Sequence, residues 1–269
     1  MSVSPSSTFE GILQDERRAR RKGSTLVLAI LAVSTAALWI TGFFDPQRFL
    51  ESGPAIAQLF SEMVPPDFGR WQRWLRPLLD TLAMSIAGTA LAAVFSLPLA
   101  LLAAPNTTPN AAVYHASRTV LAFLRSVPEI ILGVLFVAAV GFGALPGVLA
   151  LGLHSVGMVG KFYAEAIEHV DPKPLEAARA AGATPMQVIV HAVLPQVLPQ
   201  LTDVTVYRWE YHFRASTVLG IVGAGGIGFE LMAALRLLAY DQVSAILLTI
   251  LACVVVVDAI GAFLRRKLK

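Results

Sequence analysis

Long runs of apolar residues, nearly free of charged side chains, constrain this chain more than any other feature. A helix needs about 20 apolar residues to cross the hydrocarbon of a bilayer, because each residue adds about 1.5 Å. Of the 269 residues, 56% are hydrophobic and only 14% are charged, whereas a soluble domain carries about 25% charged residues. A soluble domain of this size cannot bury so much apolar surface. The sequence therefore predicts an all-α integral membrane protein with about six transmembrane helices.

Turn-forming residues and basic clusters divide the chain into segments. The predicted segments are a cytoplasmic N-terminal segment at 1–23, a first transmembrane helix at 24–44, an external connector at 45–77 with a short interfacial helix at 56–63, a membrane core at 78–266 with a polar loop at 161–192, and a tail at 267–269. Within the core, the predicted spans are 78–104, two spans in the run 118–160 divided at its glycines, 195–229 and 242–264. The run 118–160 is too long for one crossing.

Basic residues at the two ends set the predicted orientation. Clusters at 17–22 and 265–269 place both termini in the cytoplasm by the positive-inside rule, which requires an even number of crossings. Six crossings then place the loop 161–192 in the cytoplasm, although Arg70, Arg73 and Arg76 fall on the outer side. The net charge of +3 is explained by lipid headgroups, so no nucleic-acid partner is expected.

The polar loop contains signals for two short helices. Asp171 followed by prolines can start a helix, because the first turn has free backbone donors, and Gly182 suits its end. Thr184 and Gln187 then form a capping box with Pro185 between them. The loop is therefore predicted to be a helix, a hinge and a second helix.

This loop resembles the EAA loop of bacterial ABC importer permeases. The resemblance rests on Glu-Ala-Ala, the glycine after it and the later Leu-Pro, and it assigns ATPase coupling to Glu176, Ala177, Ala178, Gly182, Leu194 and Pro195. In that family the loop helix docks on a cytoplasmic ATPase. Any alanine-rich helical loop can contain Glu-Ala-Ala by chance, but the joint pattern in a cytoplasmic loop argues against chance. Ala192 stands where the family usually has isoleucine.

Further stretches look like the phosphonate ABC importer permease subunit, an inner-membrane component of binding-protein-dependent transport. These stretches are 125–129, 152–161, 207–220 and 223–228. The resemblance implies a type I ABC importer permease fold in a bacterial cell membrane. It also implies a second copy of the chain, a cytoplasmic ATPase dimer that binds ATP and Mg, and an external binding protein. Permeases for phosphate, phosphite or methionine remain alternatives, as does a stand-alone secondary transporter or channel.

Charged residues make the predicted fifth span costly, at about 2.5–3.5 kcal/mol per charge on insertion scales. The predicted pathway residues are Arg208, Glu210, His212, Arg214, Ser216 and Thr217. An arginine fork matches phosphoryl oxygens, and hydroxyl groups add donors. The alternative interpretation is a brace between helices, and the i,i+4 spacing makes Glu210 with Arg214 the predicted pair, leaving Arg208 freer. Arg125 and Glu129 are predicted to pair for the same reason.

A glycine cluster follows the fifth span. Gly223, Gly225 and Gly228 match G-x-G-x-x-G, but this match follows a helix in a membrane protein, where no dinucleotide fold can form. With Gly226 they are predicted to form a tight turn that acts as an external gate, and simple loop flexibility is the alternative. The chain has no G-x-x-x-x-G-K-[ST] phosphate loop and no metal-ligand cluster. We therefore predict a non-enzyme subunit without a cofactor, a metal or catalytic residues.

Overall fold

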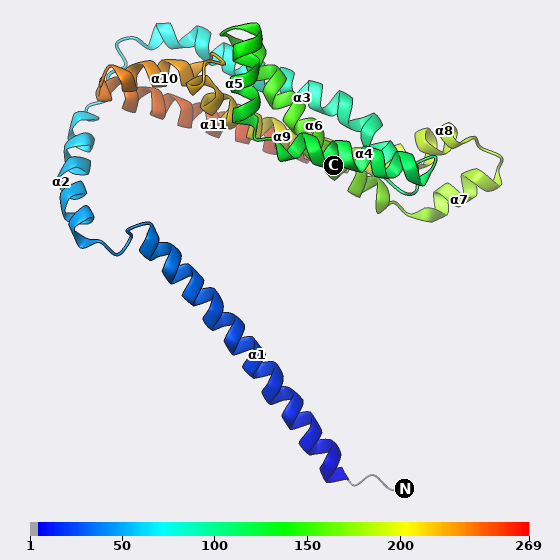
Figure 1. Ribbon diagram of the computed structural model, residues 1–269. Coiled ribbons are helices and arrows are strands. Elements are labelled where there is room, and N and C mark those ends of the chain that lie inside the picture. Colours follow the sequence, from blue (N-terminus) through cyan, green and yellow to red (C-terminus); the bar gives the residue numbers. More distant parts are fainter. Residues whose placement is uncertain (1–4, 269) are drawn as a thin grey trace. The chain divides into compact units, whose positions relative to one another are not determined.

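A computed structural model describes residues 5–268, and within them the secondary structure is helical, without strands (Figure 1). Four helices in this part of the chain are long and apolar enough to cross a membrane, or five if one bent pair counts as a span. The predicted all-α class is confirmed. The helix that corresponds to the predicted fifth span is not among them, since it carries several charged residues. The chain falls into two compact units that divide between Ser61 and Glu62.

The first unit contains α1 (Pro5–Ile40) and most of α2 (Pro46–Glu62). The apolar part of α1, Arg20–Ile40, has the length of a membrane span, and none of its apolar window is buried. The first span is predicted at 24–44, but α1 begins well before residue 24 and ends at Ile40. Gly42, just after its end, adopts φ +75°. Most of the predicted connector is helical, since α2 is longer than the interfacial helix predicted at 56–63.

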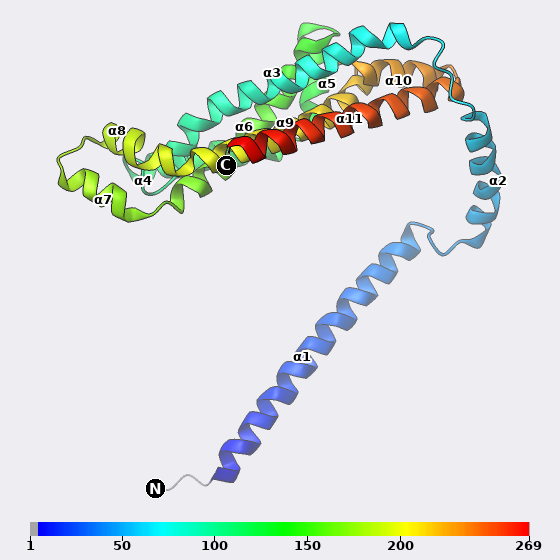
Figure 2. The same ribbon diagram turned by 180° about the vertical axis from the view of Figure 1, so that it is seen from behind.

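The second unit is a bundle of long helices that run alongside one another in Figures 1 and 2. Its long members are α3 (Trp71–Ala103), α6 (Ala144–Glu168), α9 (Leu194–Ile221) and α11 (Tyr240–Leu268). The short α10 (Ile227–Arg236) lies at one end of the bundle, and α7 (Pro172–Ala180) and α8 (Pro185–Val188) project from the other. Helix α9 contacts α3, α6, α10 and α11, while the most extensive contact between two helices of the bundle is that of α3 with α6.

The predicted third span is broken rather than straight. It consists of α4 (Ala111–Ser126) and α5 (Glu129–Val140), whose axes differ by 82°. Pro128 between them has no N–H to donate, and a proline disfavours helical backbone at the preceding residue. Val127 is accordingly extended, with ψ 119°. As a result, α5 stands across the long helices in both views (Figures 1 and 2).

The structure also tests the predicted glycine break before α6, the start of the second span and the length of the polar loop. The predicted break after the third span is confirmed, because α5 ends at Val140 and α6 begins at Ala144, with Gly141 and Gly143 at positive φ between them. Helix α3 begins at Trp71 and so includes Pro77, which had been assigned to the connector. The polar loop is shorter than predicted, because α6 continues through residues 161–168.

Small residues let the long helices approach closely, as is common between helices in membranes. A Cβ atom on Gly157 of α6 would lie 2.6 Å from the backbone nitrogen of Arg125 and 2.7 Å from the carbonyl oxygen of Leu121, both on α4. Backbone atoms cannot move aside as a flexible side chain can. Gly157 therefore fixes the distance between α4 and α6.

Gly157→Ala is expected to destabilise the folded protein by about 1–3 kcal/mol, because the added methyl overpacks the α4–α6 contact. Thermal unfolding in detergent measures the effect. Gly53→Ala is the matched control, since a Cβ atom there meets nothing within 4 Å. Equal melting temperatures for the two variants would contradict this account of the packing.

Candidate translocation and coupling sites

Several polar side chains of α9 are enclosed by the bundle. Arg208 is 7% exposed, Glu210 is 6% exposed, and His212 and Ser216 are fully buried. Arg214 is exposed and Thr217 is half-buried. These predicted pathway residues point in different directions around the helix, and the structure separates them into one group facing α3, α5 and α6 and another facing α11.

A chain of hydrogen bonds joins α9 to α6 and α3. The Nε–H of Arg208 donates to the Ser155 hydroxyl at 2.7 Å, and that hydroxyl lies 2.6 Å from Nε2 of His212. Nδ1 of His212 lies 2.7 Å from the Thr89 hydroxyl, which donates to the carbonyl of Ser85 at 2.6 Å. Because Thr89 and Ser155 each have one proton to donate, every bond is satisfied if His212 is neutral with its proton on Nδ1. We call Arg208, Ser155, His212 and Thr89 the buried polar chain.

The other side of Arg208 faces α5. Nη2 of Arg208 lies 3.9 Å from Oε2 of Glu129, and the guanidinium carbon lies 4.1 Å from the centre of the Tyr211 ring. The Tyr211 hydroxyl donates to Oε1 of Glu129 at 2.7 Å. Two predictions are therefore wrong: Glu129 pairs with Arg208 and Tyr211 rather than with Arg125, and Arg208 is not the freer arginine, since it is more enclosed than Arg214 and faces Glu129.

The charged residues that face α11 form ion pairs between helices. Nη1 of Arg265 lies 2.5 Å from Oε1 of Glu210, and Nη1 of Arg214 lies 2.9 Å from Oδ1 of Asp258. The predicted pair of Glu210 with Arg214 is wrong, because α11 runs beside α9 and supplies a partner for each. Gly261 leaves room for the Glu210 carboxylate, which a Cβ atom at that position would overlap. This geometry favours the brace interpretation for both residues.

The hydroxyls of the remaining predicted pathway residues donate to carbonyls of α9, and that of Ser216 also lies 3.5 Å from the carbonyl oxygen of Thr81 on α3. The Ser216 hydroxyl donates to the carbonyl of Phe213 at 2.8 Å, and the Thr217 hydroxyl donates to that of Arg214 at 2.6 Å. These bonds satisfy both hydroxyl donors without a ligand. Their place in a pathway stays a prediction.

The predicted glycine turn joins α9 to α10. Gly223, Gly225 and Gly226 have φ of +97°, +76° and +72°, a region that favours glycine. The N–H of Gly143, in the turn between α5 and α6, donates to the Gly223 carbonyl at 3.2 Å. Gly228 lies in the first turn of α10, against the backbone of Thr217 and Gly220. The tight turn is present, while its role as a gate stays a prediction.

The polar loop has the caps that the sequence predicts. Asp171 caps α7 by accepting from the N–H of Lys173 at 3.0 Å, and Gly182 has φ +84° after the helix. Thr184 and Gln187 form both bonds of the capping box at the start of α8. On α7, Glu176 and Ala177 are exposed and Ala178 is half-buried. Of the other predicted coupling residues, Gly182 and Pro195 are exposed and Leu194 is half-buried, so most of the set is accessible to another protein.

One glutamine, which the sequence does not single out, ties this loop to α9. Oε1 of Gln196 accepts from the N–H of Asp171 at 3.0 Å, and its Nε2 donates to the Ala192 carbonyl at 2.6 Å. Leu194 and Pro195 begin α9, directly after a π-helical turn at Ile189–Val193. Pro195 has no N–H for the carbonyl one turn earlier and crowds it, which accounts for the widened turn. Gln196 thus links the start of α7 to the first turn of α9 by hydrogen bonds.

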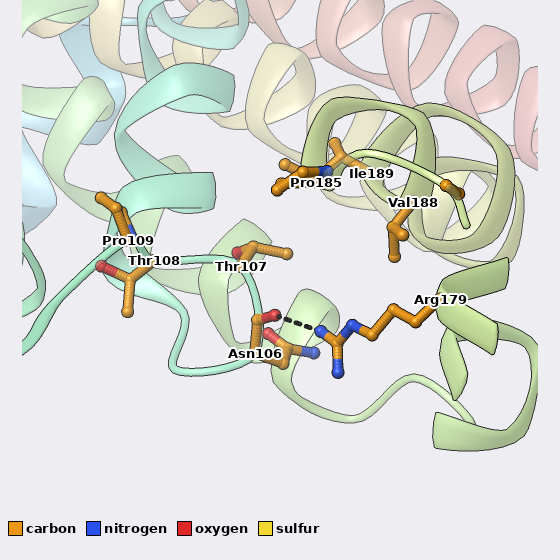
Figure 3. Close-up of a pocket in the computed structure, with 9 residues that line it drawn as sticks. Asn106, Thr107, Thr108, Pro109, Arg179, Pro185, Val188 and Ile189 are labelled. Atoms are coloured by element: carbon orange, nitrogen blue, oxygen red, sulfur yellow. Dashed lines mark hydrogen bonds between the residues drawn. The ribbon is translucent and has the colours of Figure 1, made fainter.

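A pocket of about 550 Å³ lies between this loop and the loop that joins α3 to α4. Figure 3 shows Arg179 extending toward Asn106 across the pocket, with Pro185, Val188 and Ile189 on another side. Nη2 of Arg179 donates to the Asn106 carbonyl at 3.5 Å. None of the residues that line the pocket belongs to the buried polar chain, so the pocket beside the polar loop is separate from that chain.

The family model described as "Binding-protein-dependent transport system inner membrane component" matches residues 96–269. The chain belongs to this family. It is the permease subunit of a transport system and not an enzyme. The match begins within α3 and includes the coupling loop and all of α9.

Two relatives and one solved structure describe the similarity further. The chain is 63% identical over 243 residues to the phosphite transport system permease protein PtxC of Stutzerimonas stutzeri, covering 90% of this chain and 88% of that protein. It is 44% identical over 223 residues to the phosphate-import permease protein PhnE of Mycolicibacterium smegmatis, covering 83% of this chain and 42% of that one. The fold matches a chain of the inward-facing MetNI methionine ABC transporter with a TM-score of 0.66, at 23% identity over 76% of this chain and 99% of that one. The type I ABC importer permease fold is thereby confirmed.

Ser155→Ala is expected to lower the stability of the permease by about 1–3 kcal/mol, because it leaves two buried groups, Nε of Arg208 and Nε2 of His212, without a partner. Thermal unfolding in detergent measures the loss. Ser126→Ala is the control, since that exposed hydroxyl bonds only within its own helix. A change within about 0.5 kcal/mol for Ser155→Ala, as expected for the control, would contradict the proposed chain of bonds.

Proposed function

We propose that this permease subunit carries a phosphorus oxyanion into the cell in an ATP-driven importer. The observation that carries the proposal is the 63% identity, over 90% of the chain, to a permease named for phosphite transport. A second relative is named for phosphate import, so the common substrate class is a tetrahedral anion of phosphorus. Phosphite is our first candidate, ahead of the phosphonate that the sequence suggested. The likeness to the methionine transporter supports the fold alone.

The proposed assembly contains two copies of the chain, a cytoplasmic ATPase pair that binds ATP and Mg, and an external binding protein. Each chain offers one coupling loop, and its exposed Glu176 and Ala177 suit docking on an ATPase. Both termini lie in the cytoplasm in this arrangement, because basic residues cluster at both ends. The loop of α7 and α8 then also faces the cytoplasm, with the glycine turn toward the outside as a candidate gate.

The proposed pathway follows the side of α9 that bears Arg208. A guanidinium presents a planar fork of N–H donors that matches phosphoryl oxygens, and it stays charged inside a protein. Glu210 and Arg214 are left out of the pathway, because each is paired with α11. Transport also requires release, which favours a single arginine over a cluster of strong anion ligands.

Uptake by the reconstituted importer tests this function. Proteoliposomes containing the permease and its ATPase are given the external binding protein and labelled phosphite, phosphate or a phosphonate. ATP-dependent accumulation of at least one of these anions is expected, and none without ATP. Accumulation driven by an ion gradient without the ATPase would instead support a secondary transporter and contradict the proposal.

Gly182→Val tests the coupling loop. A β-branched residue at φ +84° costs about 1–2 kcal/mol, so the hinge between α7 and α8 is expected to shift. We expect ATP hydrolysis stimulated by the loaded binding protein to fall about tenfold, in line with a cost of that order. Ala181→Val is the control, because this exposed neighbour has an ordinary φ of −76°. Equal stimulation in both variants would remove the hinge from the coupling route.

A further inference from the structure

Arg208 and Glu129 form a buried pair that is close but not hydrogen-bonded. Nη2 of Arg208 and Oε2 of Glu129 are both inaccessible, and neither has a hydrogen-bond partner among the described residues. They lie 3.9 Å apart, beyond the range of a charge-assisted bond, which is about 2.7–2.9 Å. Nε of Arg208 donates to the Ser155 hydroxyl, and Oε1 of Glu129 accepts from the Tyr211 hydroxyl. The pair therefore holds its unused donor and acceptor toward each other.

The presence of Glu129 follows from the burial of Arg208. A buried charge destabilises the protein unless an opposite charge lies beside it. Inside a membrane this holds whether the transporter is empty or loaded. An empty transporter accordingly needs a resident anion beside this arginine. Glu129 is that anion, and it is the first residue of α5, directly after the break at Pro128. No hydrogen bond to the guanidinium holds it in place in the part of the chain that the structure describes.

We propose that Glu129 is the resident counter-charge of Arg208 and that the transported oxyanion displaces it. The inference rests on the proposed function and names a specificity-determining contact of the same site. A phosphorus oxyanion offers oxygen pairs to a guanidinium fork as a carboxylate does. Nη2, which has no hydrogen-bond partner among the described residues, is then the donor for the passing anion, while Nε stays bonded to the Ser155 hydroxyl and the Tyr211 hydroxyl to Glu129. Return of Glu129 to the arginine expels the anion, which permits release.

A double-mutant cycle on the assembled importer tests this proposal. The variants are Arg208→Gln, Glu129→Gln and the double variant R208Q/E129Q, measured for assembly and for ATP-dependent uptake of labelled phosphite in proteoliposomes. Each single change leaves one buried charge uncompensated, and the double variant leaves none. We expect the double variant to recover assembly but to keep uptake at least tenfold below that of the unmodified importer, because the anion has lost its arginine.

The Arg214–Asp258 pair on the same helix is the matched control. We expect R214Q/D258N to recover both assembly and at least half of the uptake, because this pair acts only as a brace. A second double variant, Arg208→Met with Glu129→Leu, replaces the buried pair by apolar side chains of similar size. It is measured instead if R208Q/E129Q does not assemble. Its uptake is expected to be equally low.

The outcomes distinguish a failure of the Glu129 inference from a failure of the proposed transport function. If R208Q/E129Q or the apolar double variant recovers uptake together with assembly, Arg208 and Glu129 are a brace and the inference is overturned. If the unmodified importer accumulates none of the phosphorus oxyanions, the proposed function itself is overturned. Recovery of assembly without recovery of uptake, seen for this pair and not for Arg214 and Asp258, supports the displacement of Glu129.

Discussion

The structure depends on one constraint: the polar side chains of α9 have to be satisfied inside an apolar bundle. Water cannot pair with them at the centre of a membrane, so neighbouring helices supply the partners. Thr89 comes from α3, Ser155 from α6 and Glu129 from α5. Helix α11 contributes Arg265 and Asp258. The polar contacts of α9 thus specify which helix lies on each of its sides, which apolar packing alone does less sharply.

The same helix connects the two functional regions. Its first turn is bonded through Gln196 to the start of α7, and its middle carries Arg208 and His212. In the proposed mechanism, a displacement at the coupling loop reaches the buried polar chain through α9, which is continuous from Leu194 to Ile221. At the far end of α9, the glycine turn is bonded through its backbone to the turn between α5 and α6.

The sequence predicts local features of this protein well, and contacts between helices poorly. The caps of α7 and α8, the hinge at Gly182 and the glycine break before α6 follow from neighbouring residues, and the structure contains each of them. Helical spacing suggests only partners on the same helix, which gave the wrong partner for Glu129, Glu210 and Arg214. The apolar run continues through Pro128 and hides the break there, although a proline at that place signals a bend. Gln196 carries no sequence signal, since its partners come from the fold.

The displacement of Glu129 from Arg208 by the transported anion can be tested most directly by a structure of the assembled importer. The importer would be trapped in a state that holds phosphite within the membrane. The account predicts density for the anion within hydrogen-bonding distance of the Arg208 guanidinium, with the Glu129 carboxylate turned away from it. Density elsewhere along the bundle, with Arg208 and Glu129 still facing each other, would contradict it.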